Sequence, residues 1–531
     1  MVQLNLPLRP WVPQWVGLAI LFYLFIPFAM LNGTYTGTMQ EVSGTLGVLS
    51  EDISMGYYAT AVGMAVAYPI VKKIHTNLAP KTMLLSDLSL QVLLCLACAH
   101  TQSIDLIICF SFLIGFLKAF VMLWLIIHVH PFLTPRNVRS EFYAYFFPIV
   151  FGGGQLSMAL TAQLAYYYDW KYSYYFMALL LLVGILLVLV FFRYAKTQFH
   201  IPVRELHLRS MFLVSVAVLM LLYILSYGRT LDWFASPTVR AYAIAAPLLL
   251  LLFFWHQKDM EQPYVSLRPL GSVKRLLGYF YMMIVMFFSA SSSLVTNYLT
   301  SIVRVDSVRA NQLCLWLLPG FAVGAFICFW WFRWQRWRFR YLVGGGMACF
   351  ALYFGLLYFQ ISPTSTYEML FLPTFFRGLG MMTLVIAFSL YVVEKLEARY
   401  MQMNAFYLIL FRSALSPLIG MAFFSNLLYR LRMQSLPVLA ETVTQADPLA
   451  ASTYGQSLQQ SLAAGHGYAE AMQMATTAVD MTLQQQSLLL SIKTELGYML
   501  ISALVLSIVS CFIPFHKTVR VKVVRTGSDM V

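Results

Sequence analysis

The chain has 531 residues, of which 60% are hydrophobic and only 11% are charged. A soluble domain carries about 25% charged and about 45–50% apolar residues, so this composition excludes an ordinary soluble enzyme and indicates a polytopic membrane protein. The formal net charge of +14 does not indicate a nucleic-acid partner, because the basic residues lie at the ends of hydrophobic runs, where membrane topology places them.

Hydrophobic runs long enough to cross a bilayer recur along the whole chain. A spanning helix needs about 20 apolar residues, and about fourteen runs meet that length. The predicted spans are 15–35, 52–71, 83–100, 104–128, 141–165, 172–193, 210–227, 240–256, 276–298, 310–332, 340–360, 368–393, 401–428 and 495–515. The expected fold is an all-α polytopic membrane protein, and an even number of spans places both termini on one side.

Lys and Arg gather in alternate connecting segments. "VKKIHTNLAPK", "RYAKTQFHIPVRELHLR" and the tail "HKTVRVKVVR" all fall on the side of the N-terminus, whereas "HTQSID" and "ISPTSTYEM" fall on the other side. Cytoplasmic loops carry the excess of Lys and Arg. We therefore expect a multi-pass protein of the cell inner membrane with both termini in the cytoplasm. No A-x-A-like site follows the first run, so it is expected to be retained as a span.

A weak internal echo suggests two related halves. "CFSFLIGFLKAF" in the fourth span resembles "LPTFFRGLGMMT" in the twelfth, with Gly115 and Gly378 in register. Repeated halves around a central cavity are typical of secondary transporters, whose sites lie near the membrane midplane. The expected organisation is a six-helix half at 1–195, two inserted helices with linkers at 196–270, and a second six-helix half at 271–531.

A long segment separates the last two predicted spans. Residues 429–494 are rich in Gln, Ala, Ser and Met and fall on the outer side. Within them, "AEAMQMATTAVDMTLQQQSLLL" has spaced apolar residues that predict a short amphipathic helix. Two interpretations fit this composition: a solvated cap over the last helices, or a docking surface for a partner protein.

Several stretches resemble one transporter family. "YGRTLDWFASPTV" between the seventh and eighth spans, "QPYVSLRPLGSVKRLLGYF" after the eighth, and Arg412 in "FYLILFRSALSPLIG" are similar to the fourteen-helix drug:proton antiporters of the major facilitator superfamily. The long outer segment resembles the EmrB-type branch, which works with a periplasmic adaptor and an outer-membrane channel. The resemblance implies two six-helix halves plus two inserted helices, and multidrug export of lipophilic or amphipathic compounds by proton-coupled alternating access.

The chain departs from that family where proton coupling is expected. The family's first helix carries an acid where "LNGT" places Asn32, and its fourth helix carries an arginine where this chain has Ser111. The loop after the second helix loses its first Gly and its Asp, and the Gly-Pro motif of the fifth helix is absent. No carboxylate lies near a predicted helix centre, so Glu394, at the end of an apolar helix, is the candidate proton carrier.

Lys118 lies inside the apolar stretch "FLIGFLKAFVMLWLII". An ionisable residue near a helix centre costs at least about 2.5 kcal/mol and usually faces a cavity or a partner. Lys118 is roughly 15 Å from the inner end of its span, too far for its stem to reach the interface comfortably. Ser111 is seven residues earlier and shares its helix face. We therefore expect Lys118 to supply the inward-facing positive charge that the family places at Ser111.

The remaining candidates for a substrate or ion pathway lie in or beside predicted spans. Arg377 is embedded in the twelfth span, where it could pair with backbone carbonyls or with an anionic substrate group. For Arg412, a structural role between helices and a functional role are equally open. The lining residues expected by analogy are Asn32, Tyr35, Gln155, Asn297, Tyr298 and Met381. No cofactor or metal is expected, because the CxxC of Cys95 and Cys98 falls within an apolar helix.

Two other classes of function stay open. A polytopic membrane enzyme acting on lipid-linked substrates would need clustered His, Asp or Glu, or a nucleophile with a base, and "IHVHPF" comes nearest to such a cluster. A non-transporting membrane sensor would be compatible with the long outer segment. The absence of a P-loop argues against direct use of ATP. The expected partners are the lipid bilayer and a small lipophilic substrate, and the resemblance adds the adaptor and channel.

Overall fold

The computed structural model describes residues 7–134, 138–194, 206–258, 260, 263–334, 338–394, 396–397, 400–443 and 447–515. Within these ranges the regular elements are helical, apart from one antiparallel bridge between Leu8 and Phe192. The basic segments 195–205 and 516–531, on which the predicted sidedness partly depends, lie outside the described residues.

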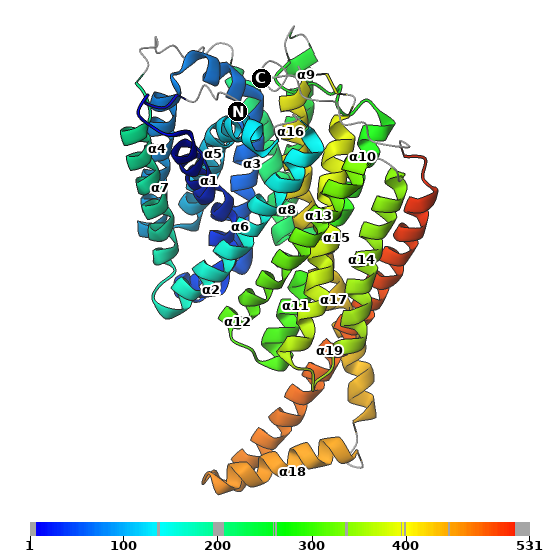
Figure 1. Cartoon of the computed structure of the whole chain (residues 1–531). Helices are drawn as coiled ribbons and strands as arrows, with labels where there is room; N and C mark the ends of the chain where they lie inside the picture. Colours follow the sequence, from blue (N-terminus) through cyan, green and yellow to red (C-terminus); the bar gives the residue numbers. More distant parts are fainter. Residues whose placement is uncertain are drawn as a thin grey trace.

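The first part of the chain, up to Lys258, forms seven helices and then the pair α8 and α9, and the second part begins with α10 at Val273 (Figure 1). They are α1 (Gln14–Gly37), α2 (Met39–Leu46), α3 (Ser50–Asn77), α4 (Pro80–His100), α5 (Ile104–Leu133), α6 (Arg139–Tyr167), α7 (Lys171–Phe191), α8 (Leu208–Tyr227), η2 (Trp233–Ala235) and α9 (Pro237–Lys258). The pair α8 and α9 packs together, and α8 lies against α3.

The second part contains several broken helices. Its elements are α10 (Val273–Ser289), α11 (Ser292–Tyr298), η3 (Leu299–Val303), α12 (Ser307–Gln312), η4 (Leu313–Trp316), α13 (Leu317–Trp334), α14 (Phe339–Gln360), η5 (Tyr367–Leu370), α15 (Phe371–Val393), α16 (Met401–Ile409), η7 (Leu410–Leu415), α17 (Ser416–Thr442), α18 (Pro448–Ala463) and α19 (Tyr468–Phe512). Both η3 and η7 are π-helical turns inside longer helical segments, a feature that recurs at functional sites.

Twelve helical segments in the described ranges are long and apolar enough to cross a membrane. The two other predicted spans correspond to α3 and α6, which have 28 and 29 residues but a less apolar composition. Both helices pack against neighbours from the two parts of the chain, α3 against α5 and α16, and α6 against α1 and α13. A helix covered on several sides by protein needs less apolar surface than one that faces lipid. The predicted all-α membrane fold is confirmed.

Two helix pairs, α3 with α5 and α13 with α15, are held together by facing glycines. A Cβ atom at Gly115 would lie 2.0 Å from the carbonyl oxygen of Thr60, and one at Gly63 would lie 2.1 Å from that of Phe112. In the second pair, a Cβ atom at Gly378 would lie 2.7 Å from the carbonyl oxygen of Leu317. Side chains larger than hydrogen are therefore excluded from both contacts, as is common where membrane helices approach closely.

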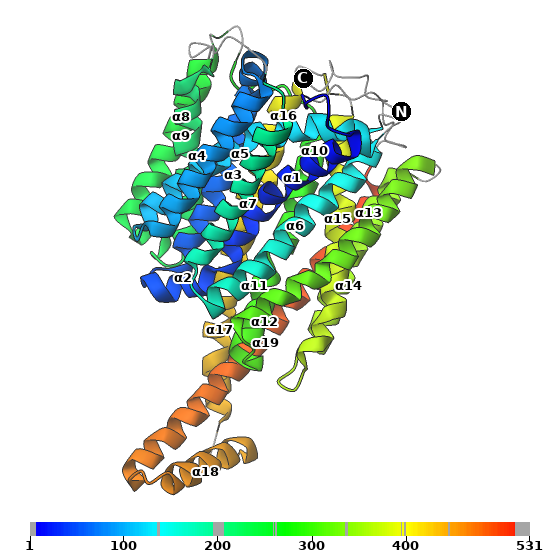
Figure 2. The ribbon, with the colours of Figure 1, turned by 60° about the vertical axis from the view of Figure 1, so that its left-hand side comes forward.

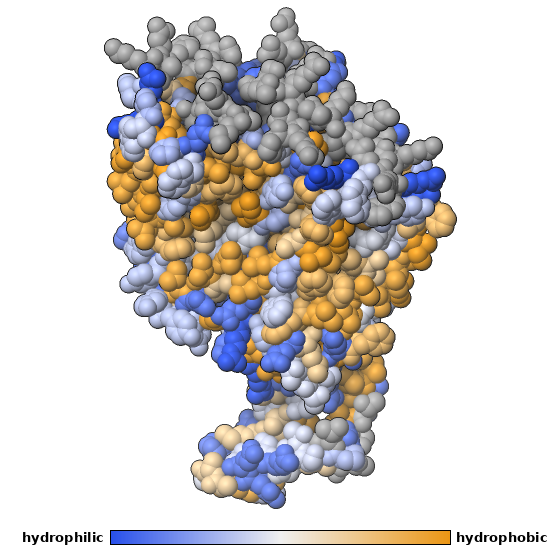
Figure 3. All heavy atoms as spheres, in the orientation of Figure 1, coloured by the Kyte–Doolittle hydropathy of each residue, from blue (hydrophilic) through white to orange (hydrophobic). Residues whose placement is uncertain are grey.

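Residues 429–443 and 447–494 form a helical projection, which corrects the expectation of a loop with one short helix. The helix α17 continues to Thr442, α18 follows, and α19 then runs for 45 residues from Tyr468 into the membrane-spanning bundle. Figures 1 and 2 show this projection extending away from the bundle in both views. Its surface mixes polar and apolar residues, whereas the bundle carries a broad apolar band (Figure 3). The predicted short amphipathic helix is thus the outer part of the last spanning helix.

Candidate functional site

A cation from the second part of the chain lies against aromatic rings from the first part. Arg412 belongs to the π-helical turn η7, and its guanidinium carbon lies 5.5 Å from the ring centroids of both Phe147 and Phe151 on α6. Tyr57 and Tyr68 of α3 are also within its electrostatic range. Its Nε atom has no hydrogen-bond partner among the described residues. The arrangement places one half-buried cation over two aromatic rings.

A second group of predicted residues meets between α1 and α5. The Tyr35 hydroxyl donates a hydrogen bond of 2.9 Å to Ser111 Oγ, which in turn donates to the Ile107 carbonyl oxygen at 2.6 Å. Tyr35, Ser111 and Lys118 are all buried, with Lys118 only 4% exposed. Lys118 lies two turns from Ser111 on the same face of α5. The structure therefore brings Tyr35 of α1 into contact with Ser111 of α5. Lys118 lies on the same face of α5 as Ser111.

A third group links α6 to α15 through η4. The Cys314 thiol donates to the Gln155 carbonyl oxygen at 3.3 Å, and Arg377 lies within electrostatic range of Cys314. The Arg377 guanidinium carbon lies 5.8 Å from the ring centroid of Tyr353, and its Nε has no hydrogen-bond partner among the described residues. Met381 is one turn further along α15 and accepts a hydrogen bond from Ser289 through its sulfur at 3.5 Å.

The other predicted pathway residues lie apart from these groups. Tyr298 is buried and its hydroxyl donates to the Ser362 carbonyl oxygen at 2.7 Å, so it ties α11 to the segment after α14. Asn297 is exposed, and Glu394 follows directly after α15. The side chain of Asn32 lies outside the described residues.

Three carboxylates that the sequence analysis did not assign to the site are Glu41, Asp87 and Glu495. The Ser307 hydroxyl of α12 donates to Glu41 Oε1 of α2 at 2.8 Å, which joins the two parts of the chain. Gln91 donates to buried Asp87 at 2.8 Å within α4. Glu495 of α19 is fully buried. Ser487, Ser491 and Glu495 are spaced four residues apart in the sequence. This spacing could have predicted a polar stripe along one face of α19.

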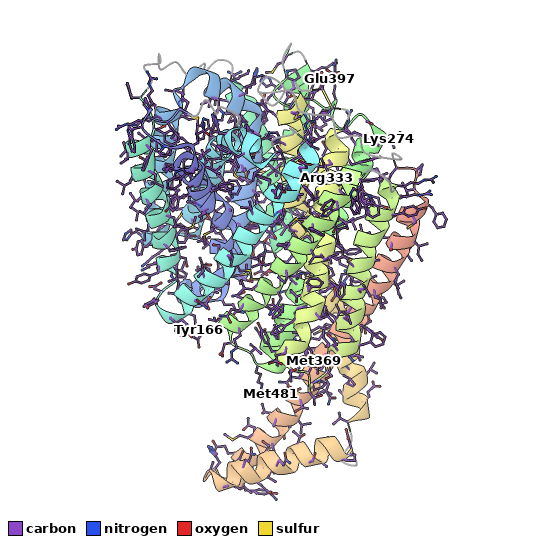
Figure 4. The ribbon with its side chains drawn as sticks, in the orientation of Figure 1. Tyr166, Lys274, Arg333, Met369, Glu397 and Met481 are labelled. Atoms are coloured by element: carbon purple, nitrogen blue, oxygen red, sulfur yellow. The ribbon has the colours of Figure 1, made fainter. Side chains whose placement is uncertain are left out.

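Charged side chains gather at the bundle end opposite the projection. Figure 4 shows Lys274, Arg333 and Glu397 at that end, whereas Met481 lies on the projection. The helix α1 begins and α19 ends at the same end as those charges (Figure 1). Within the described ranges, no three His, Cys, Asp or Glu residues come together in a way that could hold a metal ion.

The sequence matches no protein-family model and no curated protein. Its fold, however, is similar to those of solved membrane transporters. One is a structure from work on substrate recognition in proton dependent oligopeptide transporters, with 15% identity, a TM-score of 0.56, and coverage of 93% of this chain and 97% of that chain. Another is tetrameric PepTSo2, with 14% identity, a TM-score of 0.55, and coverage of 94% and 98%. The chain therefore has the major facilitator fold that the sequence predicted.

Proposed function

We propose that this protein is a secondary active transporter that moves amphipathic or lipophilic compounds across the membrane by alternating access. The observation that carries the proposal is the placement of Arg412 against Phe147 and Phe151, because it joins a cation from one part of the chain to rings from the other. Ligand sites are mostly apolar with a few placed polar groups. Rings of α3 and α6 would hold an apolar body, and the guanidinium would hold an acceptor or anionic group.

The moving parts in this proposal are the halves 1–195 and 271–531, with 196–270 as an insertion. Two observations support this division. The facing glycines of α3 and α5 have counterparts in α13 and α15, as expected if the chain contains a structural repeat. The hydrogen bond between Ser307 and Glu41 is one of several side-chain contacts between the two halves, and rocking of one half against the other would break it.

We propose protons as the coupling ion and export as the direction. One solved structure with this fold comes from work on proton dependent oligopeptide transporters, which supports proton coupling and makes peptides the competing substrate class. Export follows from the resemblance to drug:proton antiporters. Glu394 stays the sequence-based candidate for the proton carrier, and Lys118 the candidate for the charge that responds to it.

A transport assay in proteoliposomes tests this function. A panel containing lipophilic cations, lipophilic anions and short peptides should be offered under an imposed pH gradient or sodium gradient, applied separately. We expect flux of an amphipathic anion under the pH gradient. Its KM should rise roughly tenfold in Arg412→Gln, since a hydrogen bond between the guanidinium and a charged substrate group is worth about 1.5 kcal/mol, and about 1.4 kcal/mol is tenfold in affinity. Arg430→Gln is the matched control, because Arg430 is exposed on the adjoining helix α17.

Two outcomes would contradict this function. Flux of peptides alone would contradict the substrate class while keeping the transporter. No gradient-dependent flux of any probe, by protein whose fold is verified by thermal unfolding, would contradict transport itself. That result would favour the membrane sensor or the enzyme acting on lipid-linked substrates.

We also propose that the projection docks a periplasmic adaptor, which would connect the protein to an outer-membrane channel. This would place the ends of α1 and α19 in the cytoplasm and the whole protein in the inner membrane. The support is the length of α19 beyond the bundle and its exposed methionines Met472, Met474 and Met481, since such flexible side chains suit adaptable protein contacts.

Replacing α18 (Pro448–Ala463) with a short Gly-Ser linker tests the docking role. The expected result is loss of export from whole cells with flux retained in proteoliposomes, which contain no adaptor. Met472→Ser with Met481→Ser should weaken export from cells in the same direction, and Met369→Ser, outside the projection, is the control. Unchanged export from cells after removal of α18 would favour a solvated cap.

A further inference from the structure

A polar seam joins α17 to α19 where the projection enters the bundle. Ser435 of α17 lies 2.7 Å from Ser487 and 3.3 Å from Ser491 of α19, measured between hydroxyl oxygens. Ser491 also donates to the Ser487 carbonyl oxygen at 2.7 Å. On the α17 side, Ser487 donates to the Arg432 carbonyl oxygen at 3.3 Å. These hydroxyls form a hydrogen-bonded series between the two helices.

Glu495 continues the seam by one helical turn toward the bundle. Ser487, Ser491 and Glu495 are spaced four residues apart and so lie along one face of α19. The exposed fraction of Glu495 is 0%, and neither of its carboxyl oxygens has a hydrogen-bond partner among the described residues. Its neighbours along the helix, Ile492 and Leu496, are fully buried in the core of the second part of the chain.

Among the residues that the structure describes, the ionisable groups on the elements packed against this part of α19 form no ion pair or hydrogen bond with the Glu495 carboxyl. On α17, Arg432 is directed to Gln484, to whose Oε1 it donates at 3.2 Å, eleven residues from Glu495 along α19. On α14, Tyr358 lies beside Gly497, and on α11 Tyr298 donates to Ser362. Lys493 is two residues away and lies on a different face of α19. Tyr429 and Arg430 of α17 are exposed, whereas the Glu495 side chain is fully buried.

An ionised carboxylate buried without a counterion is so costly that such groups take up a proton instead. We propose that Glu495 is a proton-binding site, filled from the projection side through the seam of Ser435, Ser487 and Ser491, and that its proton drives transport in place of one carried by Glu394, the residue that the sequence suggested. The proton sits on one carboxyl oxygen while the carboxyl is enclosed. When movement of the two halves closes the seam, the proton leaves toward the end of the bundle opposite the projection, so that it crosses the membrane as coupling requires. The role of this proton in driving transport rests on the proposed transport function, whereas proton binding itself does not.

Infrared difference spectra of the full-length protein in nanodiscs test proton binding without any substrate. At neutral pH we expect the carbonyl stretch of a protonated carboxylic acid in the wild type, and its loss in Glu495→Gln. Glu470→Gln is the matched control on the same helix, because the Glu470 side chain is 57% exposed and accepts from His466 at 3.2 Å. Identical spectra for the wild type and Glu495→Gln would overturn the proposal.

The seam and the coupling role are tested by two further measurements on the same proteins. After a pH jump, Ser491→Ala should slow the loss of the acid band, whereas Ser502→Ala should not, since Ser502 donates to the Met499 carbonyl oxygen away from the seam. In proteoliposomes, Glu495→Gln should lose flux driven by a pH gradient and keep substrate exchange without a gradient. Gradient-driven flux equal to the wild type would overturn the coupling role. Loss of the band with no flux in any protein, wild type included, would instead count against the proposed transport function.

Discussion

The pairs α3 with α5 and α13 with α15 share a scaffold but differ in chemistry. In each, glycines bring two helix backbones into direct contact, at Gly115 in α5 and at Gly378 in α15. The charged group is placed differently: Lys118 follows its glycine by three residues, whereas Arg377 comes directly before the other glycine. The position in α15 that corresponds to Lys118 is Met381, which contacts Ser289.

This difference separates what holds the fold from what the fold does. A helix contact that excludes every side chain at one position leaves no freedom for substitution there. Residues three positions away lie on a neighbouring part of the helix face and can carry a cation in one pair and a thioether in the other. The repeat therefore predicts packing, and the departures from it mark candidate functional residues.

The largest effect should come from filling the shared contact. Gly115→Val and Gly378→Val each place a branched side chain against backbone atoms, and overpacking of this kind costs about 1–3 kcal/mol or more. We expect both variants to lower the thermal unfolding midpoint by several degrees or to prevent folding. Gly345→Ala is the control, because nothing lies within 4 Å of a Cβ atom at Gly345. Tolerance of valine at only one of the two glycines would break the equivalence of the pairs.

The next effect should distinguish the two halves. Lys118→Met gives α5 the same residue type that α15 has at the corresponding position, Met381. Because embedded ionisable groups often lie on ion pathways, we expect gradient-driven flux to fall roughly tenfold or more. Met381→Leu should retain flux. Wild-type flux in correctly inserted Lys118→Met would assign Lys118 a structural role only.

Arg377 should matter more for stability than for flux. Its guanidinium lies over Tyr353, a contact worth about 1–2 kcal/mol when desolvated. We expect Arg377→Gln to lower the unfolding midpoint by a few degrees with less than a threefold change in flux, and Tyr353→Leu to give the same loss without further loss in the double variant. Additive losses would show that the two residues act independently, and a collapse of flux would place Arg377 in the pathway.

The smallest effect should come from the hydrogen bond between Tyr35 and Ser111. A neutral hydrogen bond contributes about 1 kcal/mol, so Tyr35→Phe should cost approximately that much in free energy of unfolding. A double-mutant cycle with Ser111→Ala measures the interaction, and unfolding in detergent monitored by circular dichroism gives the values. A coupling energy near zero would show that the 2.9 Å contact does not link α1 to α5 energetically.

Most of the fold followed from the sequence because lipid imposes a strong and simple rule on composition. Runs of apolar residues located the helices, and the glycine echo located the equivalent contacts. The sequence did not predict how far the projection extends. The helix α19 changes from polar to apolar composition near Glu495, but its backbone continues without a break.

The site was less predictable for a different reason. Single residues such as Arg412 and Lys118 were recognisable because a charge in an apolar run is rare. Their surroundings depend on contacts between distant helices, for example Phe147 of α6 beside Arg412 of η7, and no local pattern encodes such contacts. Glu495 was passed over because its position at the start of a predicted span suggested solvent.

Alternating access is the central claim, and a reversible cross-link between the halves tests it most directly. Cysteines should replace Glu41 and Ser307, whose side chains meet at 2.8 Å, in a background without the exposed Cys109 and the half-buried Cys349 and Cys511. A short bifunctional thiol reagent that reduction cleaves would then join α2 to α12, with flux of the transported probe as the readout. The account predicts that flux stops on cross-linking and returns on reduction. Undiminished flux in fully cross-linked protein would contradict it.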